Sequence, residues 1–187
     1  MNASEDERYI QRVLAGQSSA YAFLVNKYQS QAYTLAFRLL KQEQDAEEAS
    51  QDAFVKAYRA LDTYQGGAAF STWLYRIVYN TALSRLRKKR ITTTSWDDLL
   101  HEPPIPTGTP VLEEQDRRAY VERALQKLPS YEAALVDLYY IQEKDTVEIE
   151  AITGLTRVNV RTKLFRARKK LYQYLQRTLK NGKEDLL

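Results

Sequence analysis

Apolar side chains recur at three- and four-residue intervals along almost the whole chain, and one long segment interrupts them. This interval is the period of amphipathic helices. The interruption falls at residues 91–112, which hold four of the five prolines in the 187-residue chain. Proline stops helices and sheet ladders. The sequence therefore predicts an all-α protein with two small helical domains, residues 1–91 and 113–187, joined by an extended acidic linker at 92–112.

Charges are segregated along the chain instead of being mixed. Residues 91–116 carry six acids and no Lys or Arg, whereas residues 154–180 carry nine bases and no acid. The net charge is only +4, so the distribution is more informative than the sum. Such segregation suggests a polyanionic partner that binds two basic ends separated by an acidic tether.

Several classes of function are disfavoured by composition. The chain has no cysteine, which excludes disulfides, thiolate metal sites and cysteine nucleophiles and favours a cytoplasmic protein. The N-terminal segment is acidic and amphipathic, unlike a signal peptide, and no apolar run approaches the ~20 residues needed to span a bilayer. The single histidine, His101, lies in the linker, and no nucleophile–base set or phosphate-binding glycine loop stands out. We expect no enzyme activity, no cofactor, no metal and no direct membrane insertion.

Residues 63–90 combine a glycine-containing loop, N-cap candidates at Ser71 or Thr72, and a helix that ends in a basic cluster. At 100° per residue one side of this helix is apolar, with Leu74, Ile77, Val78 and Thr81. A separate stripe carries an aromatic ring, two guanidiniums and an amide: Trp73, Arg76, Asn80 and Arg87. One interpretation is a buried Trp with a solvated basic tail. The other is a surface for single-stranded or melted nucleic acid, where stacking contributes roughly 1–3 kcal/mol per base.

The helix predicted before that loop has an acidic face. Asp45, its N-cap candidate, shares this face with Glu48 and Asp52 at i, i+3 and i+7. A face of this kind is either solvated or docked on a basic or polar partner surface.

The C-terminal part has the pattern of a helix-turn-helix unit. An eight-residue helix capped by Thr146 precedes a turn at Gly154, and Thr156 caps a long basic helix that runs to about residue 179. One face of the last helix is apolar, with Val160, Leu164, Ala167 and Leu171. Another face carries Val158, Arg161, Thr162, Phe165, Arg166 and Lys169. Arginine can read guanine with roughly 1–3 kcal/mol of discrimination; the alternative is an ordinary amphipathic surface helix.

Two stretches resemble a known family. The strings DAEEASQDAFVKAYRALDTY and FSTWLYRIVYNTALSRLRKKR resemble region 2 of the extracytoplasmic-function sigma factors. The strings LPSYEAALVDLYYIQEKDTVEIEAITGL and VRTKLFRARKKL resemble region 4 of the same family. The two regions occur in the family's order and cover nearly the whole chain.

The resemblance implies a dissociable promoter-specificity subunit of bacterial RNA polymerase, which opens promoters without ATP hydrolysis. The implied partners are core polymerase (its β′ clamp helices and β flap), promoter DNA and an anti-sigma factor. The clamp would be contacted by Asp45, Glu48, Gln51 and Asp52. The minus-ten element would be contacted by Tyr64, Gly66, Phe70, Ser71, Thr72, Trp73, Arg76, Asn80, Arg85, Arg87 and Lys88. The minus-thirty-five element would be contacted by Arg157, Arg161, Thr162, Phe165, Arg166 and Lys169.

Two other classes remain as alternatives on the sequence. A helix-turn-helix regulator that works without polymerase would explain residues 146–179, but it leaves residues 63–90 and the acidic helix unexplained. An enzyme that acts on nucleic acid would need paired carboxylates, a metal cluster or an activated nucleophile, and none of these patterns stands out.

Overall fold

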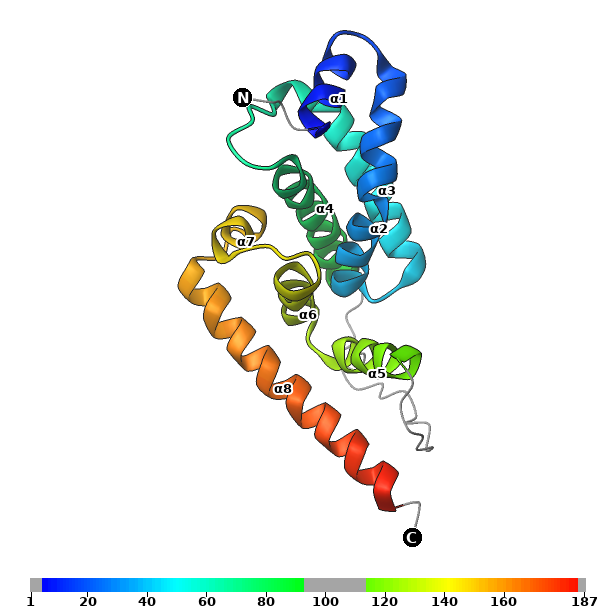
Figure 1. Ribbon diagram of the computed structural model, residues 1–187, viewed down its shortest axis with the longest axis vertical. Helices are drawn as coiled ribbons and strands as arrows, with labels where there is room; N and C mark the ends of the chain where they lie inside the picture. Colours follow the sequence, from blue (N-terminus) through cyan, green and yellow to red (C-terminus); the bar gives the residue numbers. More distant parts are fainter. Residues whose placement is uncertain (1–4, 93–113, 185–187) are drawn as a thin grey trace.

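A computed structural model describes residues 5–92 and 114–184, and all regular structure within them is helical (Figure 1). The first half holds α1 (Glu5–Leu14), α2 (Tyr21–Leu40), α3 (Glu43–Arg59) and α4 (Phe70–Thr92). The second half holds α5 (Glu114–Lys127), α6 (Ser130–Val136), α7 (Thr146–Thr153) and α8 (Arg157–Glu184). The all-α prediction is confirmed. The predicted linker beyond residue 92, with His101, lies outside the described residues.

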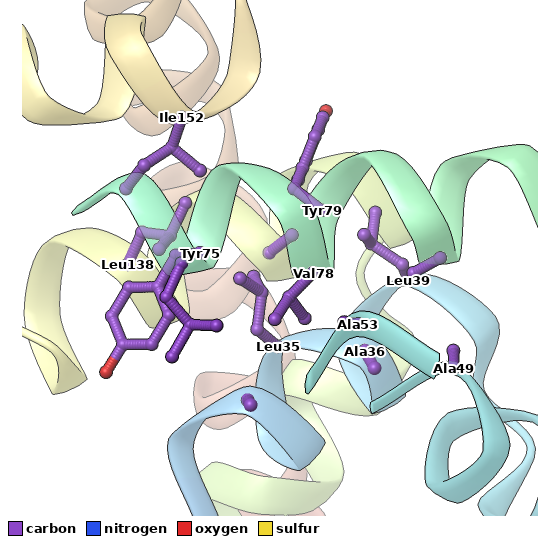
Figure 2. Packing of buried hydrophobic residues seen from close by; sticks show 14 of the residues in the cluster. Leu35, Ala36, Leu39, Ala49, Ala53, Tyr75, Val78, Tyr79, Leu138 and Ile152 are labelled. Carbon is purple, nitrogen blue, oxygen red and sulfur yellow. The ribbon is translucent and has the colours of Figure 1, made fainter. Parts of the chain in front are cut away.

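Helix α4 lies at the centre of the apolar core. Its residues Leu74 and Val78 are fully buried. Figure 2 shows Val78 beside Leu35 of α2, with Ala53 of α3 close by and Ile152 of α7 on the opposite side of the α4 ribbon. Alanines on the inner side of α3 leave room for the backbones to approach closely, and burial of these apolar surfaces is the main favourable term in folding. Helix α4 is therefore packed on two sides.

The two halves share this core instead of lying apart on their tether. Helix α4 packs against α7, and α2 packs against α6. The buried cluster that contains Tyr75 and Tyr79 of α4 also contains Leu138 and Ile152 of the second half. The sequence pattern predicted both helical units but gave no indication that they would be docked.

Helix α7 is closed at both ends by specific contacts. Asp145, and not Thr146 as predicted, is its N-cap: Asp145 Oδ1 accepts from the backbone N–H groups of Val147 at 2.7 Å and Glu148 at 2.8 Å. The Glu148 carboxylate in turn accepts from the Asp145 N–H at 3.1 Å, which completes a capping box. Gly154 ends the helix at φ +73°, a left-handed conformation that glycine adopts without strain, so the predicted turn is confirmed.

Two other predicted N-caps are wrong because the helices begin earlier. Helix α3 starts at Glu43, so Asp45 lies in its first turn, where an acid suits the helix dipole. Helix α4 starts at Phe70, so Ser71 and Thr72 also lie in a first turn. The predicted cap of α8 is confirmed, since the Asn159 N–H donates to Thr156 Oγ1 at 3.4 Å.

A buried charged pair joins the halves. Arg38 of α2 is 5% exposed, and Asp137, in the π-helical turn Asp137–Ile141, is fully buried. Arg38 Nε lies 3.5 Å from Asp137 Oδ1, and Gln142 Nε2 donates to Asp137 Oδ2 at 2.5 Å. Burial raises the pKa of Asp137 above its ordinary value, since Gln142 and Arg38 offset the lost hydration only in part. The ionised form of Asp137 is therefore held at a cost.

Because the pKa of Asp137 is raised in the folded chain, its contribution to the free energy of unfolding should depend on pH. The substitution Asp137→Asn should remove this contribution. A raised native-state pKa makes the contribution of Asp137 to the free energy of unfolding fall as pH rises from about 4, the unfolded-state value, through the native pKa. Asparagine keeps an acceptor for Gln142 without a charge, so the variant loses this slope. Urea unfolding between about pH 4 and 8 measures it. The control is Asp62→Asn, which changes an exposed acid and should leave the pH dependence of the free energy of unfolding as in the wild type. Equal pH dependence in the wild type and in Asp137→Asn would contradict the prediction.

Candidate nucleic-acid interface

The faces of α4 separate as the sequence predicts. Leu74, Val78 and Thr81 are buried, and Ile77 is half-buried. The polar stripe faces solvent along the helix: Arg76, Asn80, Arg87 and Lys88 are exposed, while Trp73 is half-buried. The buried face of α4 thus packs in the core, while the exposed face of the same helix presents cations and an amide to solvent.

Three aromatic rings stand at the start of this stripe. The ring centroids of Tyr64, Phe70 and Trp73 lie 5.6 Å apart in each of the three pairs. Phe70 is buried, so its ring supports the other two, which are half-buried. Trp73 therefore fits both sequence interpretations in part. One portion of its side chain packs against the neighbouring rings, and another portion remains accessible to solvent.

The loop beside these rings is held open to solvent. Tyr64 donates its hydroxyl hydrogen to the Ala68 carbonyl at 2.8 Å, across the turn in which Gly66 has φ +73°. Residues 65–69 are all exposed. An exposed loop that contains two glycines and two alanines therefore lies next to the aromatic rings.

The acidic face of α3 lies against the basic end of α4. Arg85 donates to Glu48 at 2.8 Å and also to Asp52, and Lys89 Nζ lies 2.9 Å from Asp45 Oδ2. The hydrogen bond to Glu48, which has the larger effect, and the hydrogen bond to Asp52 raise the pKa of Arg85. The predicted polymerase acids and part of the predicted DNA-binding bases are therefore each other's partners. Gln51, the remaining clamp candidate, is exposed and donates to Glu47 at 3.3 Å.

Helix α8 presents the predicted reading face to solvent. Val160, Leu164 and Ala167 are buried on the opposite side, as the sequence predicts. Phe165 is 63% exposed. All six residues assigned to the minus-thirty-five element are exposed: Arg157, Arg161, Thr162, Phe165, Arg166 and Lys169. In Figure 1, α7 and α8 meet at a tight corner, the arrangement of a helix-turn-helix unit.

The second half covers the first turn of α4. Lys144 Nζ donates to Ser71 Oγ at 2.8 Å, and Thr72 Oγ1 donates to Glu148 Oε1 at 2.7 Å. Thr72 is only 2% exposed as a result of this packing. Two residues assigned to DNA are thus bonded to α7 and the segment before it. Sequence reasoning missed Lys144 and Glu148, because contacts 73 and 76 residues apart leave no periodic signal.

Within residues 5–92 and 114–184, no three His, Asp or Glu side chains are grouped so that they could hold a metal ion. The same part of the chain contains no helix that is both long and apolar enough to span a membrane.

Family models match both halves of the chain. The model described as Sigma-70 region 2 matches residues 24–91, and the model described as Sigma-70, region 4 matches residues 118–171. The first range holds α3 and all of α4 except its last residue, and the second holds α7 and the first part of α8.

Similar proteins match over nearly their full length. The ECF RNA polymerase sigma-E factor of Escherichia coli K12 is 32% identical, with 91% of this chain and 94% of that protein covered. The ECF RNA polymerase sigma factor SigW of Bacillus subtilis is 29% identical, with 91% and 96% covered.

Solved structures show the same fold. The structure of CnrH in complex with the cytosolic domain of CnrY matches with a TM-score of 0.64 and 24% identity, over 90% of this chain and 95% of that chain. The sigma factor RpoE of Bartonella quintana, in complex with the anti-sigma factor NepR, matches with a TM-score of 0.66 and 22% identity, over 83% and 96%. Taken with the family models and the relatives, the two-part helical architecture identifies this chain as a member of the extracytoplasmic-function family of RNA polymerase sigma factors, the subunits that direct core polymerase to promoters.

Proposed function

We propose that α4 and the loop before it read and open the minus-ten element, while α8 reads the minus-thirty-five element. The observation that carries this proposal is the exposed stripe of α4 next to an aromatic cluster and an open loop. Single-stranded nucleic acid is bound by such combinations of stacking surface and cations. No residue in this scheme acts as a catalyst, in keeping with a family of binding subunits.

Strand opening would be driven by differential binding alone. Extruding one base costs a few kcal/mol, and stacking on an aromatic ring returns roughly 1–3 kcal/mol. The accessible parts of Tyr64 and Trp73 would provide that stacking surface, with Phe70 as a buried support. Phosphate contacts from Arg87 and Lys88, which lie further along α4, would add an affinity that falls with salt.

Duplex recognition would rest on the exposed face of α8. Arg161 and Arg166 stand on a helix whose opposite side is fixed in the core by Val160 and Leu164. A rigidly held helix can place a guanidinium against a guanine edge in the major groove, which is the most frequent specific contact between arginine and DNA.

Core polymerase would bind the acidic face of α3. A basic polymerase surface there would compete with Arg85 and Lys89 for Glu48, Asp52 and Asp45. Exposed ion pairs of this kind contribute at most ~1 kcal/mol each, so exchanging partners is inexpensive. Polymerase binding would then leave Arg85 available to DNA phosphates, which links the two partners. The fold shared with RpoE, a sigma factor solved in complex with the anti-sigma factor NepR, supports an anti-sigma factor as a further partner of this chain.

Asn80→Ala tests the role of α4. Asn80 is exposed, so its removal should leave the fold intact and reduce open-complex formation on a fully duplex promoter by roughly tenfold, about the value of one lost hydrogen bond to a charged group. Permanganate reactivity of unpaired thymines measures opening, and fluorescence anisotropy measures core binding. Ser84→Ala, one turn further along the same helix, is the matched control. Equal losses in core binding and opening would show that Asn80 only maintains the structure.

Arg161→Ala tests the role of α8. Loss of one bidentate contact predicts a loss of roughly 1–3 kcal/mol in binding of the holoenzyme to upstream duplex DNA, with unchanged core association. A gel-shift titration on upstream duplex fragments measures this, and Arg123→Ala, an exposed base on α5, is the control. Full upstream affinity in Arg161→Ala would exclude this residue from the recognition surface.

A further inference from the structure

We propose that Asp6, in the first turn of α1, is a positioning residue for opening of the minus-ten element. It acts through Tyr28 of α2, whose ring supports the aromatic cluster at the start of the α4 stripe (Tyr64, Phe70 and Trp73). The inference rests on the proposed function of α4, because it concerns the rings on which an extruded base would stack. It extends the site to a helix from which the sequence assigned no residue to polymerase or DNA.

The carboxylate of Asp6 has two partners on α2. Tyr28 donates its hydroxyl hydrogen to Asp6 Oδ2 at 2.5 Å, and Lys27 Nζ donates to Asp6 Oδ1 at 2.6 Å. The side chain of Asp6 is only 16% exposed, so these contacts are screened by solvent ions less than an ordinary surface pair is. One carboxylate therefore neutralises the lysine and fixes the position of the tyrosine hydroxyl.

The ring of Tyr28 transmits this fixed position to the aromatic cluster. Tyr28 is buried, and its ring centroid lies 5.7 Å from that of Phe70. The ring of Phe70, also buried, lies 5.6 Å from those of both Tyr64 and Trp73. Because protein interiors are close-packed, a displacement of Tyr28 shifts Phe70 instead of being absorbed. One hydrogen bond and two ring contacts thus connect Asp6 to the surfaces on which a base would stack.

The hydroxyl of Tyr28 needs an acceptor because the side chain is buried. Burial, followed by the hydrogen bond to Asp6, raises the pKa of Tyr28, so the hydroxyl keeps its hydrogen and remains a donor. A buried donor that loses its acceptor incurs the full desolvation penalty of that group. Without Asp6 the hydroxyl would turn toward water, and the attached ring would move away from Phe70.

Helix α1 also lies beside the segment that carries Tyr64. It packs against the 3₁₀ turn Leu61–Thr63, which directly precedes Tyr64 (Figure 1). Burial raises the pKa of Tyr64, and the negative charges of Glu7 and Asp6 add to this shift. The acids of α1 are therefore close enough to act on the Tyr64 ring. The first turn of α1 thus adjoins the aromatic cluster both through Tyr28 and beside Tyr64.

Rings that are already held in place favour opening, because they bind an extruded base without further ordering. Side chains that must be immobilised on binding lower the affinity, and a binding site is only as precise as the residues that support it. Asp6 contacts neither DNA nor core polymerase in this scheme. Its loss should therefore reduce promoter opening while core binding and upstream recognition are unchanged.

Asp6→Ala removes the acceptor and tests the inference in the full-length chain. Trp96→Phe leaves Trp73 as the only tryptophan of the two in the sequence, so its fluorescence reports on the aromatic cluster. We expect acrylamide to quench Trp73 more efficiently in Asp6→Ala than in the parent chain. We also expect roughly tenfold less open complex on a duplex promoter, the order of effect of one hydrogen bond left unmade. Permanganate reactivity with reconstituted holoenzyme measures opening, and fluorescence anisotropy measures core binding.

Three companion variants separate positioning from a change of charge. Glu5→Ala removes an exposed acid of the same turn, whose carboxylate lies 3.8 Å from the guanidinium of Arg8, and should behave as the parent chain does. Asp6→Asn keeps an oxygen that accepts from Tyr28 and should retain most of the opening. Tyr28→Phe, added to Asp6→Ala, removes the hydroxyl that has lost its acceptor. This double variant should return both Trp73 quenching and opening toward the parent values.

The outcomes distinguish this inference from the proposed function. Circular dichroism follows the folding of each variant, and Asp6→Ser, whose hydroxyl ends one bond short of the carboxylate oxygens, replaces Asp6→Ala if that variant does not fold. Unchanged Trp73 quenching, unchanged opening, or no recovery on adding Tyr28→Phe would overturn the role of Asp6.

Trp73→Ala is measured in parallel. If it impairs opening while the folded Asp6 variant does not, only the role of Asp6 is rejected. If Trp73→Ala opens the promoter as well as the parent chain does, the proposed function of α4 is rejected together with the role of Asp6.

Discussion

Burial of α4 on two sides is the constraint on which the rest of the structure depends. Leu74 and Val78 join α4 to α2 and α3, whereas Tyr75 and Tyr79 extend the same core to the second half. Only a narrow stripe is left for solvent, and the polar side chains Arg76 and Asn80 occupy it. The helix that carries the proposed minus-ten surface is therefore also the helix that joins the two halves.

Because α4 both carries the proposed minus-ten surface and joins the two halves, the contacts between the halves are of two kinds. Apolar contacts give the interface its area, and the polar contacts at Arg38 and Lys144 fix its register. The Arg38–Asp137 pair is a weak source of stability, because desolvation of the charges consumes most of the attraction. Breaking such a pair by removing one partner is nevertheless costly. An interface with this composition specifies one docked arrangement of the two halves.

The sequence predicted the features that depend on periodicity and turn chemistry. The exposed stripe of α4, the buried stripe of α8 and the turn at Gly154 all follow from spacing within one helix or from a single left-handed residue. The helix starts were predicted less well, because Asp145 and Gln42 compete with nearby polar residues for the N-cap position. Contacts such as Arg38–Asp137 could not be predicted, since they join residues about a hundred positions apart; an arginine and an aspartate within apolar helical runs were the only local signals. The docking of the two halves escaped prediction for the same reason.

Selection of promoters from a randomised DNA library by core polymerase reconstituted with this chain tests the central claim most directly. If α4 and α8 read separate elements, the transcribed templates should share two short sequence blocks about two helical turns apart. Arg161→Ala should relax the upstream block while the downstream block is retained. Recovery of a single block, or of no shared sequence above the level given by core polymerase alone, would contradict the account.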